Sequence, residues 1–387
     1  MKAITTNHFA RYARSVSILL FLCVAVPGLH AQEFKAVHPG VEYAKVEHKI
    51  GEDPVKINLL RLDLTKVRLD VKLGMDMVLG TETTSSIARR HGAVAAINSG
   101  FFRLDNSIFA GDPAGVLMID NVLLSESLND RVAMMIENGS AETRVHFHRA
   151  EAGNAIVVRG RQIKVGTNRE RQGDDIVIYT REFNRTALTG PGGMEFVVQN
   201  GRVRRVFIGQ GSNVIPENGY LISASGTRRD ELRSLLRVGT RVGFLTLHSS
   251  PESITPEAAF GRAEDITNGV SHLIRNGSVH LTWEAEKASR AFAENRHPRT
   301  AVAKMKDGKF LMITVDGRQP GVSVGMTLQE LAEYLLSVGA VDAINLDGGG
   351  STTMFLDGRV VNTPSDQNGE RKVGDAIIVT LRPNNKK

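Results

Sequence analysis

The chain has 387 residues, enough for one large domain or two ordinary ones with a sizeable core. Glycine is frequent, with 38 residues, and aromatic residues make up only 5% of the chain, which is typical of short strands and tight turns rather than of a helical bundle. The formal net charge of +6 is small and there is one cysteine, so neither a nucleic-acid-binding chain nor a disulfide-rich scaffold is indicated.

Residues 1–31 have the pattern of a secretory signal peptide. Three basic residues precede the apolar run 16–26, which is too short to span a bilayer. An uncleaved membrane anchor is the alternative. Cleavage would lower the formal charge to +3 and remove Cys23. The sequence therefore predicts a secreted or periplasmic protein that has no nucleic-acid partner and no stable membrane insertion after the leader is removed.

The first elements after the leader alternate between strand and helix patterns. Ile57–Leu64 and Val67–Leu73 both show a two-residue hydrophobic alternation, which predicts strands. Thr83–His91 predicts a short capped helix that ends at a glycine. The apolar strand Ala93–Ile97 then leads into Asn98.

The middle of the chain, about residues 115–285, predicts a series of short strands. Turn signals recur there as Asp120-Asn121 and as Asn-Gly pairs that begin at residues 138, 200, 218 and 276. No Pro- or Ser-rich linker interrupts the series. We therefore expect an α+β fold, with a β-rich mixed sheet and a few helices, in a single compact domain that extends from residue 32 to residue 387.

The last hundred residues predict a strand, a helix and a second strand. The first strand is Lys309–Val315. Thr327 and Glu330 then form a capping box, and the helix that they begin has leucines at helical spacing along one face. Val341–Leu346 is the second strand, and it leads directly into Asp347.

An internal similarity links two of these strands. Gly92–Asn98 and Gly339–Asn345 are identical at every position but one, and each follows a predicted helix. If the two strands lie parallel in one sheet, Asn98 and Asn345 emerge at the same carboxyl edge, where ligands commonly bind in α/β sheets. We therefore expect one sheet edge that carries Asn98, Asp316 and Asp347.

The segment Asp347-Gly348-Gly349-Gly350-Ser351 is the strongest candidate for a site. It places an acid at a strand end beside three residues without a β-carbon. Unshielded backbone amides bind anionic oxygen well, so an acid next to them indicates chemistry rather than packing. The alternative is a structural glycine turn with a solvated aspartate.

Five further residues are candidates for contacts with an anionic sugar ligand. An arginine fork binds two phosphate oxygens at once, which makes Arg299 a phosphate ligand candidate. Asp316 and Arg318 directly follow a strand end, and Glu370 and Arg371 follow a polar loop that could close over a ligand. The alternatives are a surface ion pair for Arg299, a turn-forming role for Asp316 and a solvated pair for Glu370 and Arg371.

Four stretches in this order resemble the phosphodiester glycosidase family over about residues 95–382. They are Ile97–Phe102, Pro298–Ala301, Val315–Arg318 and Ala343–Met354, followed by a similar tail at 361–371. Two positions depart from the family pattern, since Ser99 stands where glycine is frequent and Asn268-Gly269-Val270 stands near a place where a Gly-Gly pair is usual.

The resemblance implies hydrolysis of a glycosidic bond to phosphate, as in N-acetylglucosamine-1-phosphodiesters. Asp347 would be nucleophile, base or stabiliser of an oxocarbenium-like state. Arg299 would hold the phosphate together with the amides of the glycine segment. Asn98 and Asn345 would fix sugar hydroxyls, and Asp316 would orient a hydroxyl or Arg299. The expected partner is a glycan or sugar-phosphate substrate in envelope or extracellular material.

Two other functions fit the same residues. Asp316, Asp347 and Asp366 could hold a hard divalent metal, which would make the protein a phosphodiesterase that cuts the P–O bond. Alternatively, the protein could bind glycan phosphates without turning them over. No cofactor is certain from the sequence, and a divalent metal is the candidate.

Overall fold

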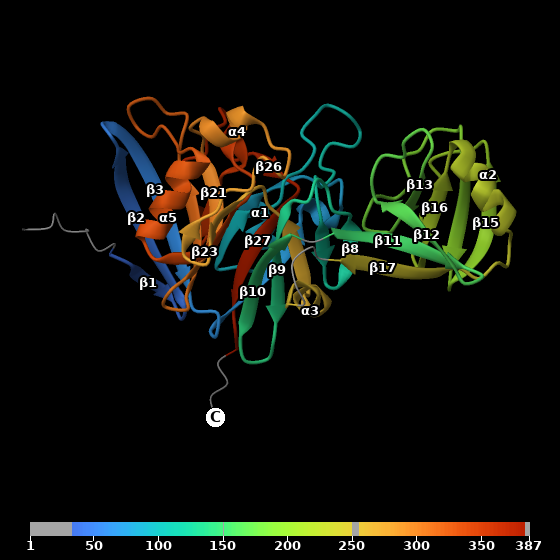
Figure 1. The fold of residues 1–387 in the computed structure, drawn as a ribbon, viewed down its shortest axis with the longest axis horizontal. Coiled ribbons are helices and arrows are strands. Elements are labelled where there is room, and N and C mark those ends of the chain that lie inside the picture. Colours follow the sequence, from blue (N-terminus) through green and yellow to red (C-terminus); the bar gives the residue numbers. More distant parts are fainter. Residues whose placement is uncertain (1–32, 150, 250–254, 384–387) are drawn as a thin grey trace, which may run out of the picture. The chain divides into compact units, whose positions relative to one another are not determined.

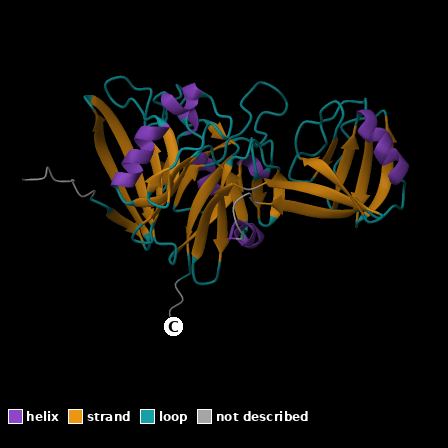
Figure 2. Ribbon diagram, in the orientation of Figure 1, coloured by secondary structure: helices purple, strands orange, loops and turns teal. Residues whose placement is uncertain are grey.

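An eight-stranded sheet carries three of the predicted site residues at one end. The computed structural model describes residues 33–149, 151–249 and 255–383, so the predicted leader lies outside the described residues. Within Phe34–Lys387 the described chain forms one compact unit (Figures 1 and 2). In spatial order the sheet consists of β1 (Lys35–His38), β2 (Val41–Ile50), β3 (Asp53–Leu62), β22 (Phe310–Val315), β21 (Arg299–Met305), β23 (Ala340–Asn345), β19 (His272–Arg275) and β20 (Ser278–Val279).

Two five-stranded sheets pack on the first one. The first is ordered β25 (Arg359–Val360), β24 (Met354–Leu356), β6 (Ala95–Asn98), β27 (Asp375–Leu381) and β4 (Val67–Leu73). The second is ordered β10 (Thr143–Arg149), β9 (Val132–Asn138), β18 (Asp265–Asn268), β7 (Leu117–Ile119) and β8 (Val122–Ser125). A short pair joins β26 (Lys372–Val373) to β5 (Glu82–Thr83).

A seven-stranded sheet is formed by the middle of the chain. Its order is β15 (Arg202–Ile208), β14 (Met194–Gln199), β16 (Gly219–Ala224), β13 (Ile176–Tyr179), β12 (Arg161–Thr167), β11 (Glu151–Val158) and β17 (Gly243–Ser249). The helices are α1 (Thr84–Arg90), α2 (Gly226–Leu235), α3 (Thr255–Arg262), α4 (Arg290–Glu294) and α5 (Leu328–Ser337), and Gly74–Asp76 and Gly349–Ser351 are 3-10 turns. Strands thus dominate the described residues and helices are few, so the predicted β-rich α+β fold is confirmed.

The alternation along β22 shows why this strand is buried on both faces. Phe310 and Met312 face one hydrophobic core cluster, which the five-stranded sheets complete. Ile313 and the residues on the same side face a second cluster, which contains Leu331 and Leu335 of α5. Since side chains of a strand alternate between faces, one apolar run supplies both clusters. Figure 1 shows α5 beside β23, and α5 also contacts β19 and β20.

Local signals in the sequence are confirmed at both predicted helix starts. Thr83 accepts a hydrogen bond from the Ser86 amide at the start of α1. Thr327 and Glu330 form the complete capping box at the start of α5. Asn-Gly and Asp-Asn turns with positive φ close the hairpins β7–β8, β14–β15 and β19–β20. The pair at 218–219 instead follows a longer loop before β16.

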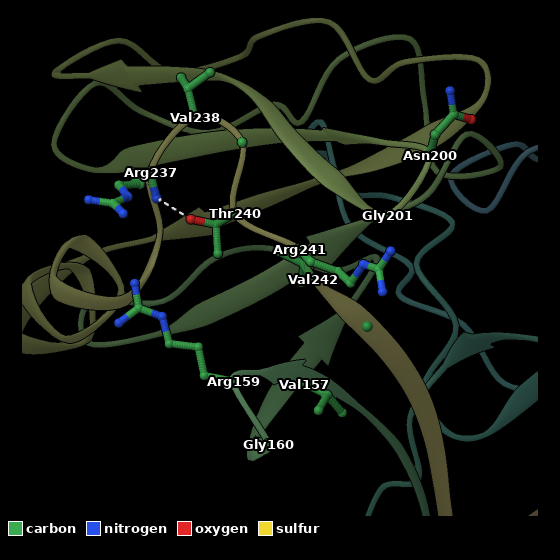
Figure 3. Close-up of a pocket in the computed structure, with 12 residues that line it drawn as sticks. Val157, Arg159, Gly160, Asn200, Gly201, Arg237, Val238, Thr240, Arg241 and Val242 are labelled. Atoms are coloured by element: carbon green, nitrogen blue, oxygen red, sulfur yellow. Dashed lines mark hydrogen bonds between the residues drawn. The ribbon is translucent and has the colours of Figure 1, made fainter.

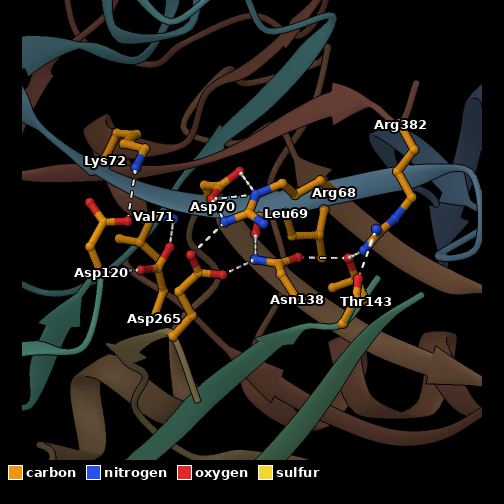
Figure 4. Close-up of polar contacts among 12 residues, drawn as sticks. Arg68, Leu69, Asp70, Val71, Lys72, Asp120, Asn138, Thr143, Asp265 and Arg382 are labelled. Atoms are coloured by element: carbon orange, nitrogen blue, oxygen red, sulfur yellow. Dashed lines mark hydrogen bonds and ion pairs between the residues drawn. The ribbon is translucent and has the colours of Figure 1, made fainter. Parts of the chain in front are cut away.

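Side chains cover the free edge of β4 in place of another strand. Asp265 accepts hydrogen bonds from the amides of Val71, at 2.7 Å, and Asp120, at 2.9 Å. The Asn138 amide donates to the carbonyl of Leu69 at 2.8 Å (Figure 4). Buried backbone groups need partners, so this network joins the two five-stranded sheets and explains these polar residues without a ligand. Burial raises the pKa of Asp265 to about 6.

The expectation of one shared parallel sheet edge is wrong for Asn98. Its strand β6 lies in a five-stranded sheet and pairs antiparallel with β24 and β27, whereas Asn345 ends β23 in the eight-stranded sheet. The similarity of the two segments reflects small-residue strands that follow helices. The two strand ends nevertheless meet, because the side-chain amide of Asn98 donates to the carbonyl of Asp347 at 2.6 Å.

Candidate active site

Three predicted residues lie at one end of the eight-stranded sheet. Strand β21 pairs antiparallel with both β22 and β23, so its first residue lies beside the last residues of its two neighbours. Arg299 is opposite Val315, and Asp316 follows that residue directly. Asp347 follows the end of β23 by two residues. The sheet therefore brings Arg299, Asp316 and Asp347 to the same edge.

The glycine segment forms a tight turn against the start of β21. The Gly349 amide donates to the Pro298 carbonyl at 2.9 Å, and a β-carbon on Gly348 would lie 2.8 Å from the same oxygen. The Gly348 amide donates to the Asp347 carboxylate at 2.9 Å. Two of the three glycine amides are thus used by the protein itself, which corrects the expectation of three unshielded amides. The glycines are needed for close packing.

Two guanidinium groups lie directly on this turn. A β-carbon on Gly349 would lie 3.0 Å from Nη2 of Arg318, and a β-carbon on Gly350 would collide with Arg371 and Asp366. Arg371 is held by two contacts to Asp366, at 2.8 and 3.0 Å. Arg318 is exposed. The positive charge beside the glycine turn therefore comes from side chains that the sequence placed among the candidates for substrate binding.

Asp347 has the electrostatics of a group that titrates near neutral pH. Burial raises its pKa to about 6, and it is opposed by the Ser351 hydroxyl, the Gly348 amide and the charges of Arg371 and Arg131. A carboxylate with such a pKa can hold or release a proton under ordinary conditions. Ser351 itself is fully buried.

Asp375 is a second carboxylate at this place, and the sequence analysis missed it. Its two oxygens accept hydrogen bonds from the Gly100 amide at 3.0 Å and from the Thr267 hydroxyl at 3.1 Å. Burial raises its pKa to about 6, and the charge of Asp347 raises it further. The sequence did contain a signal for this residue, because an acid at the start of the apolar strand 375–381 is unusual in a buried strand.

Arg131 is a further residue that the sequence analysis missed. Its guanidinium lies 5.5 Å from the centre of the Phe101 ring and donates to the carbonyl of Ala114. Burial lowers its pKa, and the charges of Glu286 and Asp347 act in the opposite direction. Its Nε is buried without a hydrogen-bond partner among the described residues. Arg131 thus brings a positive charge into the neighbourhood of Asp347 from a different sheet.

Asn98 and Asn345 are held inside the protein. The Asn98 side chain also accepts from the Thr300 hydroxyl at 2.8 Å and from the Thr353 amide at 3.1 Å, and the residue is 0% exposed. The Asn345 amide nitrogen donates to the carbonyls of Val270 and Leu346. These contacts make Asn98 a brace between strand ends. The carbonyl oxygen of Asn345 is buried without a partner among the described residues, so it retains hydrogen-bonding capacity.

Arg299 is also committed to main-chain oxygens. Its Nε donates to the Met326 carbonyl at 2.8 Å, and Nη2 donates to the carbonyls of Phe292, at 2.7 Å, and Asn295, at 3.0 Å. Only 1% of the residue is exposed, and burial lowers its pKa to about 9. Through Nε and Nη2 the guanidinium therefore fixes the loop before β21.

Asp316 and Glu370 are likewise bound within the protein. Asp316 holds the start of the polar tail loop 361–371, and Glu370 joins the end of this loop to the start of α1. The Asp316 carboxylate accepts from the Asn362 side chain at 3.2 Å and from the Thr363 amide at 3.1 Å, and burial raises its pKa. Glu370 accepts from the Ser85 amide in the first turn of α1 at 3.0 Å. The tail loop 361–371 is thus held at one end by Asp316 and at the other by the first turn of α1.

The three aspartates of the metal hypothesis do not form a ligand group. Asp316 is bound to Asn362 and Thr363, and Asp366 is bound to Arg371. Within the ranges that the structure describes, no group of three or more His, Cys, Asp or Glu side chains could hold a metal ion.

Residues 192–380 match the family model described as phosphodiester glycosidase. The chain is 34% identical over 180 residues to the N-acetylglucosamine-1-phosphodiester alpha-N-acetylglucosaminidase of Bos taurus and 33% identical over 181 residues to that of Mus musculus. Each match covers 44% of this chain and 33% of the relative, so the chain matches about a third of the length of these curated relatives. The resemblance seen in the sequence is confirmed.

Two solved structures share the fold over most of the chain. A hypothetical protein from Synechocystis superposes with a TM-score of 0.75 and 25% identity, over 89% of this chain and 62% of its own. A candidate exported protein from Burkholderia pseudomallei K96243 gives a TM-score of 0.74 and 25% identity, over 86% of this chain and 74% of its own. Among the described residues, none of the helices is both long enough and apolar enough to cross a bilayer.

Proposed function

We propose, starting from the phosphodiester glycosidase match of residues 192–380, that this protein hydrolyses the glycosidic bond of sugar-1-phosphodiesters. The observation that carries the proposal is the position of Asp347, a half-buried carboxylate whose pKa is raised to about 6, beside a glycine turn that two arginines contact. The named relatives act on N-acetylglucosamine-1-phosphodiesters, so we propose a substrate of the same class.

The charges around the turn suit one phosphodiester group. A phosphodiester has one negative charge, and Arg318 and Arg371 lie against adjacent glycines of the turn. Arginine forks bind phosphate oxygens through charge-assisted hydrogen bonds. We therefore assign the phosphate to Arg318 and Arg371, with Arg131 as a nearby third positive charge. Arg299, the residue first considered for this role, supports the turn from behind through its contacts to main-chain oxygens.

The leaving group makes strong acid catalysis unnecessary. Cleavage of the C–O bond at the anomeric carbon releases a phosphate monoester, whose second pKa is about 6. The barrier is then lowered mainly by stabilising charge at the anomeric carbon and by positioning. Asp347 in its ionised form serves as the nucleophile or as the base that activates water, and the distance between carboxylates across the bound substrate decides between retention and inversion.

Asp375 acts through Asp347 and the segment Ser99-Gly100 rather than on the substrate. It is 5% exposed, and both of its carboxylate oxygens are engaged by Gly100 and Thr267. Two nearby carboxylates oppose each other's ionisation. Asp375 is therefore coupled to Asp347, whose charge raises the pKa of Asp375, and it fixes the strand end from which Asn98 and Ser99 contact the turn.

We further propose that the protein acts outside the cytoplasm on envelope or extracellular glycans. The leader pattern of residues 1–31 supports an exported protein, and the structurally similar Burkholderia protein is described as a candidate for export. We propose that a single phosphodiester glycosidase domain occupies residues 32–387, with the family-like core at about residues 95–382.

Hydrolysis of an N-acetylglucosamine-1-phospho-alkyl substrate in ¹⁸O-labelled water tests the proposal. Label in the sugar shows C–O cleavage, and label in the phosphate would instead establish a phosphodiesterase. Asp347→Ala should abolish release with the fold intact. Asp342→Asn is the matched control, because Asp342 lies on the same strand at the other end, near Lys304. Binding without turnover by the wild type would make the protein a glycan-binding protein.

A further inference from the structure

The seven-stranded sheet has a different charge from the rest of the molecule. Residues 151–249 contain fifteen Lys and Arg and nine Asp and Glu, whereas the chain from residue 33 onward outside this segment contains thirty basic and thirty-three acidic residues. The segment thus has a net positive charge, whereas the rest of the chain beyond the leader has a net negative charge. Such a segregated charge attracts anionic partners and raises their local concentration.

This segment also contains a pocket of about 970 Å³ at the turns of β11–β12, β14–β15 and the approach to β17. Three arginines line it, Arg159, Arg237 and Arg241, and all three are exposed. The lining contains no carboxylate. In Figure 3 the side chains of Arg159 and Arg237 extend towards the same side of the pocket, and that of Arg241 extends towards the other side.

The arginines of the pocket differ from their neighbours in having no acidic partner among the described residues. Arg161, two positions from Arg159, pairs with Glu231 at 2.8 Å. Arg228 pairs with the same glutamate, and Arg229 pairs with its neighbour Asp230. The acids of α2 are thus already used by Arg161, Arg228 and Arg229. Arg159, Arg237 and Arg241 pair with no acid among the described residues, a property that they share with Arg204, Arg205 and Arg233 of the same segment, but they are the ones that line a pocket.

The strand β11 leads from this pocket to the segment that precedes Arg131. Its last residues reach the pocket at Val157, and its first residues are bound to Ser127, whose amide donates to the Ala152 carbonyl at 2.9 Å. Ser127 precedes Arg131 by only four residues. An eight-residue strand is about 25 Å long. A ligand that reaches from the pocket to the active site must therefore be a chain of several units.

We propose that the pocket lined by Arg159, Arg237 and Arg241 is a second binding site, which holds the phosphates of a phosphodiester-linked glycan chain. The ligand class rests on the proposed function. A glycan chain linked by phosphodiesters has one negative charge in every repeat, which the arginines could bind, and a glycosidic bond to phosphate, which the active site would hydrolyse. A concave pocket with charges on two sides suits a chain better than it suits the flat surface of a membrane.

The test measures binding of a linear poly(N-acetylglucosamine 1-phosphate) chain to the Asp347→Asn protein, in which turnover does not interfere. The triple variant Arg159→Ala, Arg237→Ala, Arg241→Ala should bind at least about tenfold more weakly and depend less on salt. Arg161→Ala is the matched control and should bind like the parent. Neutral dextran should not bind.

Three results would overturn the proposal: equal affinity in the triple variant, an equal loss in Arg161→Ala, or stronger binding to phosphatidylglycerol vesicles than to the polymer. Arg237→Glu is a second variant at an exposed turn position, and it should weaken polymer binding while the melting temperature stays unchanged. With Asp347 present, turnover of a monomeric N-acetylglucosamine-1-phospho-alkyl substrate should be the same in the triple variant and the wild type. Failure of the proposed function would instead appear as absent turnover in the wild type itself.

Discussion

Asp347 and Asp375 are connected through a single residue of the main chain. The Ser99 carbonyl accepts from the Asp347 amide at 3.0 Å, and the Ser99 amide donates to the Asp375 carbonyl at 3.2 Å. The next residue, Gly100, donates to the Asp375 carboxylate. A β-carbon on Gly100 would lie 2.8 Å from the Asn268 side chain, so glycine is required for this approach. The two acids are thereby fixed relative to each other by backbone.

The pH dependence of kcat/KM should show this coupling. If Asp347 works in its ionised form, kcat/KM falls as the pH is lowered through about 6. Asp375→Asn removes a nearby negative charge, so the pKa of Asp347 decreases and the acidic limb moves to lower pH. Rate profiles between pH 4 and 8 for both proteins check this. If kcat/KM of Asp375→Asn were lower at every pH but decreased over the same acidic range as in the wild type, Asp375 would have a structural role and no effect on the pKa of Asp347.

Stability should depend on pH for the same reason. The pKa of Asp375 is higher in the folded state than in the unfolded chain, so its contribution to stability is complete below about pH 4 and is lost as the pH rises through about 6. Asp375→Asn removes this loss. The free energy of unfolding of the variant, relative to that of the wild type, should therefore increase by on the order of 2–3 kcal/mol from pH 4 to pH 7, since one pKa unit corresponds to 1.36 kcal/mol.

Urea denaturation at the two pH values measures this difference. Glu52→Gln supplies the control, because Glu52 is exposed in the turn between β2 and β3. A difference for Asp375→Asn that is the same at pH 4 and pH 7 contradicts the assignment of a raised pKa.

Arg318 should contribute to substrate binding and not to folding. It is exposed, and its guanidinium lies over Gly349. Arg318→Ala should lower kcat/KM by about 10- to 100-fold, since a charge-assisted contact to phosphate contributes about 1.5–3 kcal/mol. The melting temperature should not change. Arg290→Ala is the control, because Arg290 is an exposed arginine that pairs only with Glu294. Equal kinetics for Arg318→Ala and wild type would remove Arg318 from the site.

The helices α1 and α5 and several hairpins could be predicted from the sequence because their signals are local, whereas α2 and α3 were missed and lie in the middle segment, where only strands were expected. Thr327 and Glu330 are three residues apart and begin α5 as expected. The assignment of strands to sheets could not be predicted, because it depends on contacts between distant segments. Strand β6 pairs with β27, and the two lie almost three hundred residues apart in the sequence. The likeness of the segments at 92–98 and 339–345 therefore did not indicate a common sheet.

The same distinction applies to the site. Asp347 and the glycine turn are contiguous, so one short segment indicated them. Asp375 reaches the site only because β27 pairs with β6, and Arg131 only because β9 begins beside Phe101. Arg299 was correctly placed at the edge, but a sequence does not show that main-chain carbonyls occupy its guanidinium.

Gly350 should be sensitive to the smallest substitution. An alanine β-carbon there would collide with the paired side chains of Asp366 and Arg371. Gly350→Ala should destabilise the protein by about 1–3 kcal/mol and lower turnover more than tenfold, because the ion pair must move away from the turn. Gly192→Ala is the control, since a β-carbon at Gly192 meets nothing within 4 Å. Thermal unfolding and release assays of both variants compare them directly, and equal behaviour would contradict the close packing.

Arg299 should matter more for stability than for phosphate binding. Its three hydrogen bonds satisfy the carbonyls of Phe292, Asn295 and Met326. Arg299→Met keeps much of the volume but removes the donors to the Phe292 and Asn295 carbonyls, while the Met326 carbonyl keeps the His297 amide, so we expect a loss of about 2–4 kcal/mol. Arg299→Lys should recover only part of it, because an ammonium cannot reproduce the planar fork. Arg296→Met is the control, since Arg296 makes half-exposed ion pairs with Asp53 and Glu330. If Arg299→Met stayed fully stable and only the KM for substrate rose, Arg299 would be a phosphate ligand after all, and the assignment of the phosphate to Arg318 and Arg371 would have to be extended to it.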